Sequence, residues 1–245
     1  MTKWLVTFVR HGETHLNKER VLQGQIKPDP PLNDTGRQQG STLGKFWEDR
    51  IFTHVYSSDL NRAHTTCRLI MDENLDFKAN KSPKIMLDER IRERSFGVFE
   101  GTNYGEYTKQ ARLSGEDIRH YKPPKGESYL EVQERAKQFF EDVCSEIYQS
   151  SQSRQSDTPF PSANVLVVSH GATLRTIFDY LKEDIGCQLD VKEISNTARF
   201  SFEIVFPCTN DTVVIEKSQP IENMKSKLPW LNGMTVKCLE VNGLC

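Results

Sequence analysis

Two short apolar runs, each ending in a histidine and a glycine, place the strongest limit on how this chain can fold. Residues 4–9 (WLVTFV) lead into Arg10-His11-Gly12, and residues 165–168 (VLVV) lead into Ser169-His170-Gly171. A continuous apolar run of this kind is typical of a strand buried on both faces in a parallel sheet. Ligands of an open α/β sheet bind beyond the carboxyl ends of its strands. We therefore expect both histidines to reach one crevice, although they lie far apart in the chain.

Helical segments alternate with further short strands, which predicts an α/β fold. We expect a three-layer α/β/α sandwich with a mostly parallel central sheet and helices on both faces. The expected strands lie at 4–9, 54–57, 85–87, 165–168, 199–206 and, at an edge, 235–239, with 212–217 as a hairpin partner of 199–206. We expect one helix at 35–50 and a second that begins at a cap, Ser58 or Asp59, and ends at about residue 74. A third helix is expected to follow a Ser128–Glu131 capping box, and a fourth to span 172–184.

We expect residues 1–245 to form one domain. Gly, Tyr and charged residues are frequent after residue 90, and this composition predicts a helical or loop insertion at about 101–135. A low-complexity stretch rich in Ser and Gln predicts a mobile segment at about 149–163.

The composition excludes several classes of partner. Hydrophobic residues make up 36% of the chain and charged residues 27%, and the net charge of −2 offers no general attraction to nucleic acid or to an anionic membrane. No apolar run approaches the roughly 20 residues that span a bilayer. The six cysteines form no C-x-x-C pair, and no secretory leader pattern precedes residue 4. We expect a cytoplasmic monomer with free thiols, with the nucleus and mitochondria left open.

Arginines surround the first histidine junction and a possible acid. Arg10 is next to His11, Arg62 follows a strand at the start of a helix, and Arg94 is next to Glu93. The planar fork of arginine matches the oxygens of a phosphate group. A single histidine could equally well have a structural role, and a single arginine could be a surface charge; the combination favours a phosphate pocket. Glu93 is the candidate general acid, and Glu106 is a second candidate.

Four motifs together resemble the histidine phosphatase (phosphoglycerate mutase-like) superfamily. They are R-H-G-E-T from Arg10, S-S-D-L-x-R-A-x-x-T from Ser57, R-E-R-x-x-G-x-x-E-G from Arg92, and S-H-G from Ser169. The resemblance implies that His11 is the phosphorylated nucleophile and that Glu93 is the proton donor. It also implies a catalytic His170 that, with Arg10 and Arg62, forms the positive pocket. The expected phosphate or substrate contacts further include Asn17, Gln23, Gly24 and Arg94.

The same resemblance implies a reaction that needs no metal and no cofactor, because arginines supply the positive charge. Within the superfamily the likeness is greatest to the fructose-2,6-bisphosphatases, which implies hydrolysis of fructose 2,6-bisphosphate to fructose 6-phosphate and a lower glycolytic flux. Arg94-Ser95-Phe96-Gly97 departs from the R-H-Y-G of the mutases. The alternatives are a phosphoglycerate mutase or 2,3-bisphosphoglycerate phosphatase, and a non-catalytic member that binds a phosphorylated ligand. Three lysines of the insertion could meet a second phosphate: Lys109, Lys122 and Lys125.

Overall fold

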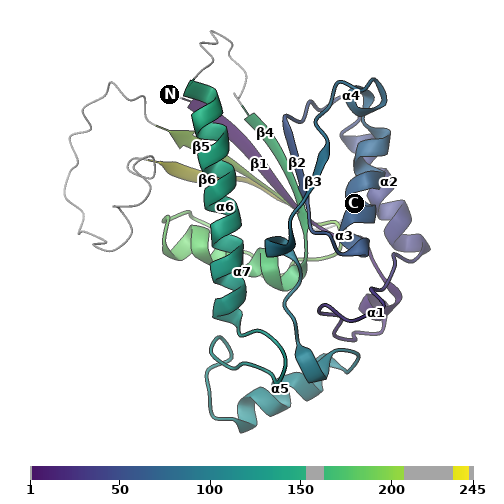
Figure 1. Ribbon diagram of the computed structural model, residues 1–245, viewed down its shortest axis with the longest axis vertical. Coiled ribbons are helices and arrows are strands. Elements are labelled where there is room, and N and C mark those ends of the chain that lie inside the picture. Colours follow the sequence, from purple (N-terminus) through teal and green to yellow (C-terminus); the bar gives the residue numbers. More distant parts are fainter. Residues whose placement is uncertain (1, 153–162, 207–233, 243–245) are drawn as a thin grey trace, which may run out of the picture.

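The computed structural model describes residues 2–152, 163–206 and 234–242, and it places a six-stranded sheet at their centre (Figure 1). The strand order is β3-β2-β4-β1-β5-β6. Four neighbouring strands run parallel, whereas β5 is antiparallel to both β1 and β6. The bounds are β1 Thr2–Arg10, β2 His54–Ser57, β3 Ile85–Leu87, β4 Ala163–Ser169, β5 Arg199–Phe206 and β6 Thr235–Asn242.

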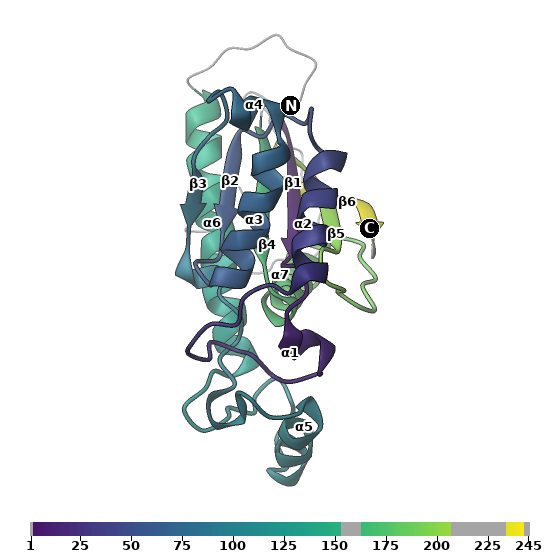
Figure 2. The same ribbon diagram turned by 90° about the vertical axis from the view of Figure 1, so that its right-hand side faces the viewer.

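Helices cover both faces of the sheet, and the predicted α/β/α sandwich is confirmed. One layer holds α2 (Asp34–Phe46) and α3 (Asn61–Glu73), and the opposite layer holds α6 (Tyr129–Gln152) and α7 (Gly171–Glu183) (Figure 2). The chain also forms two short helices, α1 (His15–Lys18) and α4 (Leu75–Lys78), and two 3-10 turns, Glu89–Ile91 and Gly97–Phe99. Helix α5 (Tyr104–Leu113) lies beyond the carboxyl ends of the parallel strands (Figure 1).

The two apolar runs form central strands because each buries both of its faces. In β1, Trp4, Val6 and Phe8 pack into the core under α6 and α7, whereas Val9 faces the core under α2 and α3. Strand β4 divides its residues in the same way, with Val165 on the first side and Leu166 on the second. Successive side chains of a strand point to opposite faces. A continuous apolar run is therefore the pattern that a doubly covered strand requires.

The structure confirms one of the expected helix caps and shows that another was wrong. The Ser128 hydroxyl accepts a hydrogen bond from the Glu131 amide (3.2 Å), and the Glu131 carboxylate accepts one from the Ser128 amide (2.8 Å), so the capping box is present. Neither Ser58 nor Asp59 caps α3, whose N-cap is Leu60 without a side-chain bond. Both polar side chains have tertiary partners instead: Ser58 bonds to His170, and Asp59 pairs with Arg92.

Other boundaries also differ from expectation. Helix α2 ends at Phe46 rather than near residue 50, and the Arg50 guanidinium turns back to donate to Thr7 at 2.8 Å. Residues 149–152 belong to α6, whereas 153–162 and the expected hairpin partner at 212–217 lie outside the described residues. The single-domain organisation and the insertion at about 101–135, where α5 and the start of α6 lie, stay predictions.

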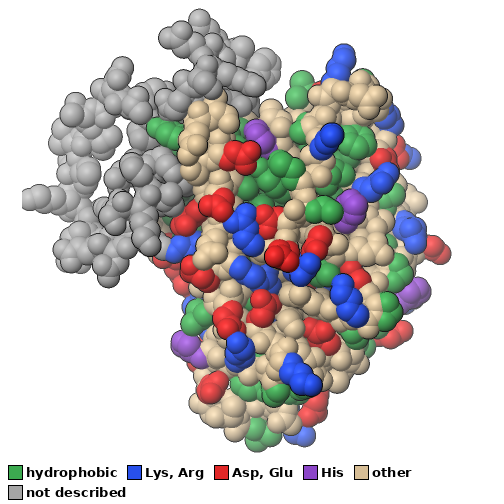
Figure 3. Space-filling view, viewed as in Figure 1, with side chains coloured by type: hydrophobic (Ala, Val, Ile, Leu, Met, Phe, Trp, Pro, Cys, Tyr) green, Lys and Arg blue, Asp and Glu red, His purple; other side chains and the backbone are tan. Residues whose placement is uncertain are grey.

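The part of the chain that the structure describes contains no candidate membrane-spanning helix. None of its helices is both long and apolar enough to cross a bilayer. On the face over α6, acidic and basic side chains are interspersed, with no large area of a single charge (Figure 3). This distribution is in keeping with the small net charge.

An aromatic cluster under α7 provides a direct test of the packing. The buried ring of Phe178 lies 4.7 Å from Phe200, 5.6 Å from Phe202 and 5.9 Å from Phe8, measured between centroids. Because Phe178→Ala would leave a cavity among these rings, we expect the free energy of unfolding to fall by about 3–5 kcal/mol in urea titrations.

The matched control is Leu113→Ala. Leu113 is 71% exposed, so its truncation should change stability by no more than about 0.5 kcal/mol. A loss below about 1 kcal/mol for Phe178→Ala would contradict this account of the core.

Candidate active site

The pairing of β1 with β4 brings the two histidine junctions together. The strands are parallel and in register, with Arg10 opposite Ser169, and the His11 amide donates to the Ser169 carbonyl at 2.9 Å. The imidazole rings of His11 and His170 follow directly, and their centroids lie 5.1 Å apart. Both side chains are buried. The structure thus places the two rings next to each other, as the sequence led us to expect, and with Arg10 and Arg62 they form the site called the pocket here.

The hydrogen bond of His11 defines which of its nitrogens is free to react. Its Nδ1 lies 2.7 Å from the Gly12 carbonyl oxygen, which only accepts hydrogen bonds. Nδ1 must therefore carry the proton, and the lone pair is on Nε2. Burial lowers the pKa of His11 well below 6.5, and the nearby charges of Arg62 and Arg10 lower it further. At neutral pH this imidazole is a neutral base.

His170 has one partner in the pocket. Its Nε2 lies 2.9 Å from the Ser58 hydroxyl, and its buried Nδ1 has no hydrogen-bond partner among the described residues. Burial, followed by the charge of Arg62, lowers the pKa of His170 well below its usual range. A second neutral imidazole with an unused polar atom therefore faces the first.

Two guanidinium groups, that of half-buried Arg10 and that of buried Arg62, complete the positive side of the pocket. Arg10 donates from Nη1 to the Ile194 carbonyl at 2.7 Å. Arg62, which is completely buried, donates to Asp29 at 2.6 Å and to the Gly24 carbonyl at 2.7 Å. In both arginines the buried Nε–H has no acceptor among the described residues. Leaving a buried donor unpaired costs about 1–3 kcal/mol, so these atoms fit a bound anion.

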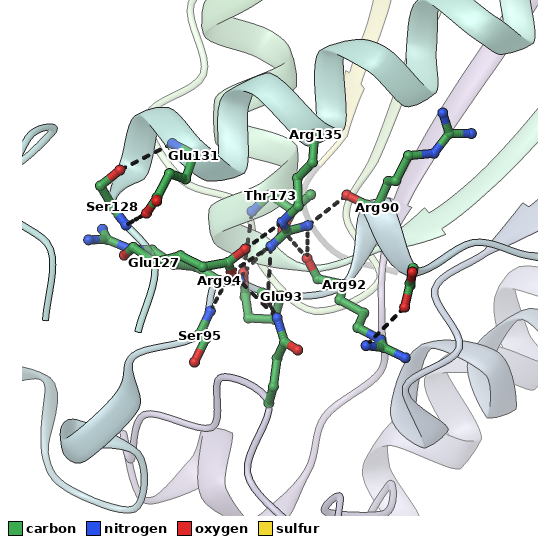
Figure 4. Close-up of polar contacts among 12 residues, drawn as sticks. Arg90, Arg92, Glu93, Arg94, Ser95, Glu127, Ser128, Glu131, Arg135 and Thr173 are labelled. Carbon is green, nitrogen blue, oxygen red and sulfur yellow. Dashed lines mark hydrogen bonds and ion pairs between the residues drawn. The ribbon is translucent and has the colours of Figure 1, made fainter. Parts of the chain in front are cut away.

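Glu93 lies at the beginning of α7. Its carboxylate accepts hydrogen bonds from the amides of Ala172 and Thr173, both at 3.3 Å, and from its neighbour Arg94 at 2.9 Å (Figure 4). The first amides of a helix have no partner within the helix, and here the Glu93 carboxyl group accepts from two of them. Gly171, in the same turn, lies against the Arg10 guanidinium, where a Cβ would be 3.4 Å from Nε. A carboxyl group is therefore held close to the positive pocket.

Comparison with known proteins assigns this arrangement to a family. The model of the histidine phosphatase superfamily (branch 1) matches residues 6–204. The chain belongs to this superfamily. It is 36% identical over 247 residues to the fructose-2,6-bisphosphatase TIGAR of Bos taurus, with 88% of each chain covered. It is 34% identical over 173 residues to the probable phosphoglycerate mutase GpmB of Escherichia fergusonii, covering 69% of this chain and 70% of that one.

The fold agrees with the family. YhfR of Bacillus stearothermophilus superimposes on this histidine phosphatase with a TM-score of 0.61 and 28% identity, covering 89% of this chain and 98% of that one. The predicted resemblance to the superfamily is thereby confirmed over most of the chain.

The remaining predicted contacts of this histidine phosphatase lie around the pocket, but protein partners occupy their polar groups. Asn17 forms a capping box with Thr14, and its Oδ1 also accepts from Asn196 at 3.3 Å. Gln23 accepts from the Thr14 hydroxyl at 2.9 Å, and Gly24 presents its carbonyl to Arg62. Their role in substrate binding stays a prediction.

The Arg94 guanidinium bonds to backbone carbonyls of the predicted insertion. It donates to the carbonyls of Glu127 (2.8 Å) and Tyr121 (2.9 Å) and stacks over Phe96 and Tyr107. It lines a cavity of about 510 Å³ between α7 and the α5 segment, and Gly171 borders this cavity as well. A contact between Arg94 and a phosphate group stays a prediction.

The other candidates of the insertion are on its surface. Glu106 is exposed on α5 and bonds to Gln110 at 3.2 Å. Lys122 pairs with Glu131 at 2.6 Å, while Lys109 and Lys125 are exposed. Within residues 2–152, 163–206 and 234–242, no group of three or more His, Cys, Asp or Glu side chains is arranged to hold a metal ion.

Several residues that contact the histidine junctions were given no role at the site from the sequence. Ser58 holds His170, Thr66 accepts from the Gly12 amide at 2.9 Å, and Asn196 donates to the His11 carbonyl at 2.9 Å. Ser58 and Thr66 lie within the S-S-D-L-x-R-A-x-x-T motif, but the motif by itself does not give their hydrogen-bond partners, and Asn196 lies in none of the motifs. Only their position against the histidine junctions shows what they do.

The two neutral histidines lead us to predict how the free energy of unfolding depends on pH. Their pKa values are lowered in the folded state, so below about pH 6.5 the unfolded chain binds more protons than the folded one. The free energy of unfolding should therefore fall as pH drops below about 6.5, by up to about 1.4 kcal/mol per pH unit for each histidine. Urea titrations between pH 7.5 and 5.5 measure this slope.

The controls for this experiment are two single substitutions. His11→Asn should flatten the slope, whereas His15→Asn, at an exposed position, should leave it unchanged. Equal slopes for the wild type and His11→Asn would show that His11 is not held neutral by the fold.

Proposed function

We propose that this histidine phosphatase hydrolyses small phosphorylated metabolites through a phosphohistidine on His11, and that its substrate is fructose 2,6-bisphosphate. The observation that carries the proposal is the free Nε2 lone pair of His11 in a pocket with unpaired Arg10 and Arg62 donors. A neutral imidazole is a nucleophile, and the guanidinium groups stabilise negative charge on the phosphoryl oxygens.

The reaction proceeds in two steps. In the first, Nε2 of His11 attacks phosphorus, the bond to the leaving oxygen breaks, and Glu93 gives that oxygen a proton. The phosphohistidine carries a positive charge, which the Nδ1–H···O=C bond to Gly12 stabilises. In the second step, Glu93 takes a proton from water, the water oxygen attacks phosphorus, and the P–N bond breaks. Phosphate leaves, and His11 is neutral again.

The relatives support the choice of substrate. The relative in Bos taurus, 36% identical over 88% of both chains, is named a fructose-2,6-bisphosphatase. Fructose 6-phosphate and phosphate would be the products, and loss of the bisphosphate would lower glycolytic flux. The cytoplasm, where this chemistry would act, stays the expected compartment.

One observation favours a second function. The relative in Escherichia fergusonii, at 34% identity, is named a probable phosphoglycerate mutase. A mutase would return the phosphoryl group to the product instead of to water. Assays for free phosphate and for mutase turnover, with 2,3-bisphosphoglycerate and the phosphoglycerates included among the esters, separate the two functions.

We expect His11→Ala to abolish phosphate release from fructose 2,6-bisphosphate, because the substitution removes the nucleophile that forms the covalent intermediate. The wild-type protein, quenched during turnover with substrate labelled at the 2-phosphate, should carry an acid-labile phosphoryl group that this variant lacks. Normal turnover by His11→Ala would reject the nucleophile, and a wild type without labelled protein would reject the covalent pathway.

We expect Glu93→Gln to lower kcat by roughly 10²–10⁴-fold while KM changes little, because the amide keeps the shape of the acid but cannot donate its proton. Steady-state kinetics on the same substrate measure both constants. Glu106→Gln, on the exposed face of α5, is the control and should keep wild-type kcat. A large loss in the control with none in Glu93→Gln would assign the acid role to Glu106.

A further inference from the structure

The segment that carries Glu93 has no regular secondary structure of its own. Residues 93–96 lie between the 3-10 turns Glu89–Ile91 and Gly97–Phe99, outside any strand or helix. Its peptide groups therefore have no ladder partners. Backbone amides bond to the carbonyls of Ser95 and Phe96, and side chains supply the other hydrogen bonds of the segment. Whatever supplies those bonds sets the position of the Glu93 carboxylate.

One side chain of α6 bonds to the backbone that leads into this segment and to Glu93 itself. Arg135 donates from Nη1 to the carbonyls of Arg90 (2.6 Å) and Arg92 (2.8 Å), and from Nη2 to the carbonyl of Glu93 (3.2 Å) (Figure 4). Its remaining donors reach both carboxylate oxygens of Glu127, at 2.8 and 3.0 Å. A guanidinium has five N–H donors, and each of these five bonds uses one.

Glu127 extends the contact beyond Glu93. Its Oε2 accepts from the Ser95 amide at 2.8 Å as well as from Arg135. The backbone is thus held on both sides of Glu93, and Gln25 adds a bond to the Glu93 carbonyl at 2.9 Å. The Arg135 and Glu127 side chains are only 17% and 25% exposed, so water competes little for these bonds.

Helix α6 gives Arg135 a rigid base. Ala136, Phe139 and Phe140, all buried, pack this helix into the core it shares with α7 and the sheet. The beginning of α7 is the place where the Glu93 carboxylate rests. One packed unit therefore fixes both the backbone and the side chain of Glu93.

We propose that Arg135, with Glu127, is a positioning pair that holds the Glu93 carboxyl group in place for proton transfer. The proposal rests on the function proposed above. Neither side chain touches the substrate: the pair acts through the backbone of residues 90–95. Proton transfer to the leaving oxygen depends on hydrogen-bond geometry, and a displacement of about 1 Å is enough to cost about 10²-fold in rate.

The test compares two substrates that differ in their need for an acid. Fructose 2,6-bisphosphate has a sugar leaving group that must be protonated, whereas p-nitrophenyl phosphate releases a stable phenolate. Arg135→Lys keeps the charge but loses the planar fork. We expect kcat/KM, which reports phosphoryl transfer to His11 and not the later attack of water, to fall about 10- to 100-fold on the sugar phosphate and to change by less than about 3-fold on the nitrophenyl ester.

Three further variants serve as a benchmark, a control and a second test. Glu93→Gln sets the benchmark and should show the same selectivity with a larger loss. Arg90→Lys is the matched control, because the Arg90 side chain ion-pairs with Asp88 and Asp142 in the same region and makes no contact with Glu93. It should leave both rates unchanged. Glu127→Gln breaks the bidentate ion pair with Arg135 by changing the acidic partner. If circular dichroism shows that Arg135→Lys does not fold, Glu127→Gln tests the positioning role in its place.

The outcomes separate this proposal from the one it rests on. The positioning role is overturned if folded Arg135→Lys or Glu127→Gln slows both esters equally or slows neither. In that case a Glu93→Gln variant that still slows the sugar phosphate selectively leaves the acid role intact. A Glu93→Gln variant without selectivity overturns the acid role and the positioning role together. A wild type that forms no phosphoenzyme overturns the proposed function itself.

Discussion

The parallel, in-register pairing of β1 with β4 is the constraint on which the rest of the site depends. It continues by one residue past the strand end, through the bond from the His11 amide to the Ser169 carbonyl, and so sets the two imidazoles side by side. A shift of one residue would turn every side chain of one strand to the other face. Both strands are buried on both faces, so such a shift would misplace the core as well as the site.

The pocket is built in a way that costs stability. Two histidines are held neutral in the protein interior, and the buried Nε–H groups of Arg10 and Arg62 have no acceptor among the described residues. The negative charges of Asp29 and Glu93 raise the pKa of Arg62, against the larger effect of burial, which lowers it. A site of this kind is organised before an anion arrives, and the anion supplies the missing hydrogen bonds.

The acidic side of the site depends on a different kind of support. Strand ends hold the histidines, but Glu93 lies on irregular backbone, and helices α6 and α7 hold it from two directions. Arg135 bonds to its carbonyl, and the first amides of α7 bond to its carboxylate (Figure 4). His11, the proposed nucleophile, and Glu93, the proposed acid, are thus attached to the same core by separate elements. The sheet fixes the first, and a layer of packed helices fixes the second.

The fold class, most of the strands and the two histidine junctions follow from the sequence alone. Hydrophobic periodicity and the length of an apolar run are local properties that indicate which residues are buried. They therefore sufficed to predict that residues 4–9 and 165–168 form central strands. The Ser128–Glu131 capping box is equally local, and it was predicted correctly. The motifs around His11 and His170 also sufficed to indicate the superfamily that the comparison then showed.

Only the tertiary structure decided the partners of the polar side chains. Ser58 was expected to cap a helix but bonds to His170. The Arg94 guanidinium, a predicted phosphate contact, also bonds to the backbone carbonyls of residues 121 and 127, which the sequence did not indicate. Arg135 looks like any charged residue on an amphipathic helix, yet it holds the segment that carries Glu93. A long polar side chain has several possible partners of similar energy. Which one it meets depends on segments far away in the chain, and no local pattern records them.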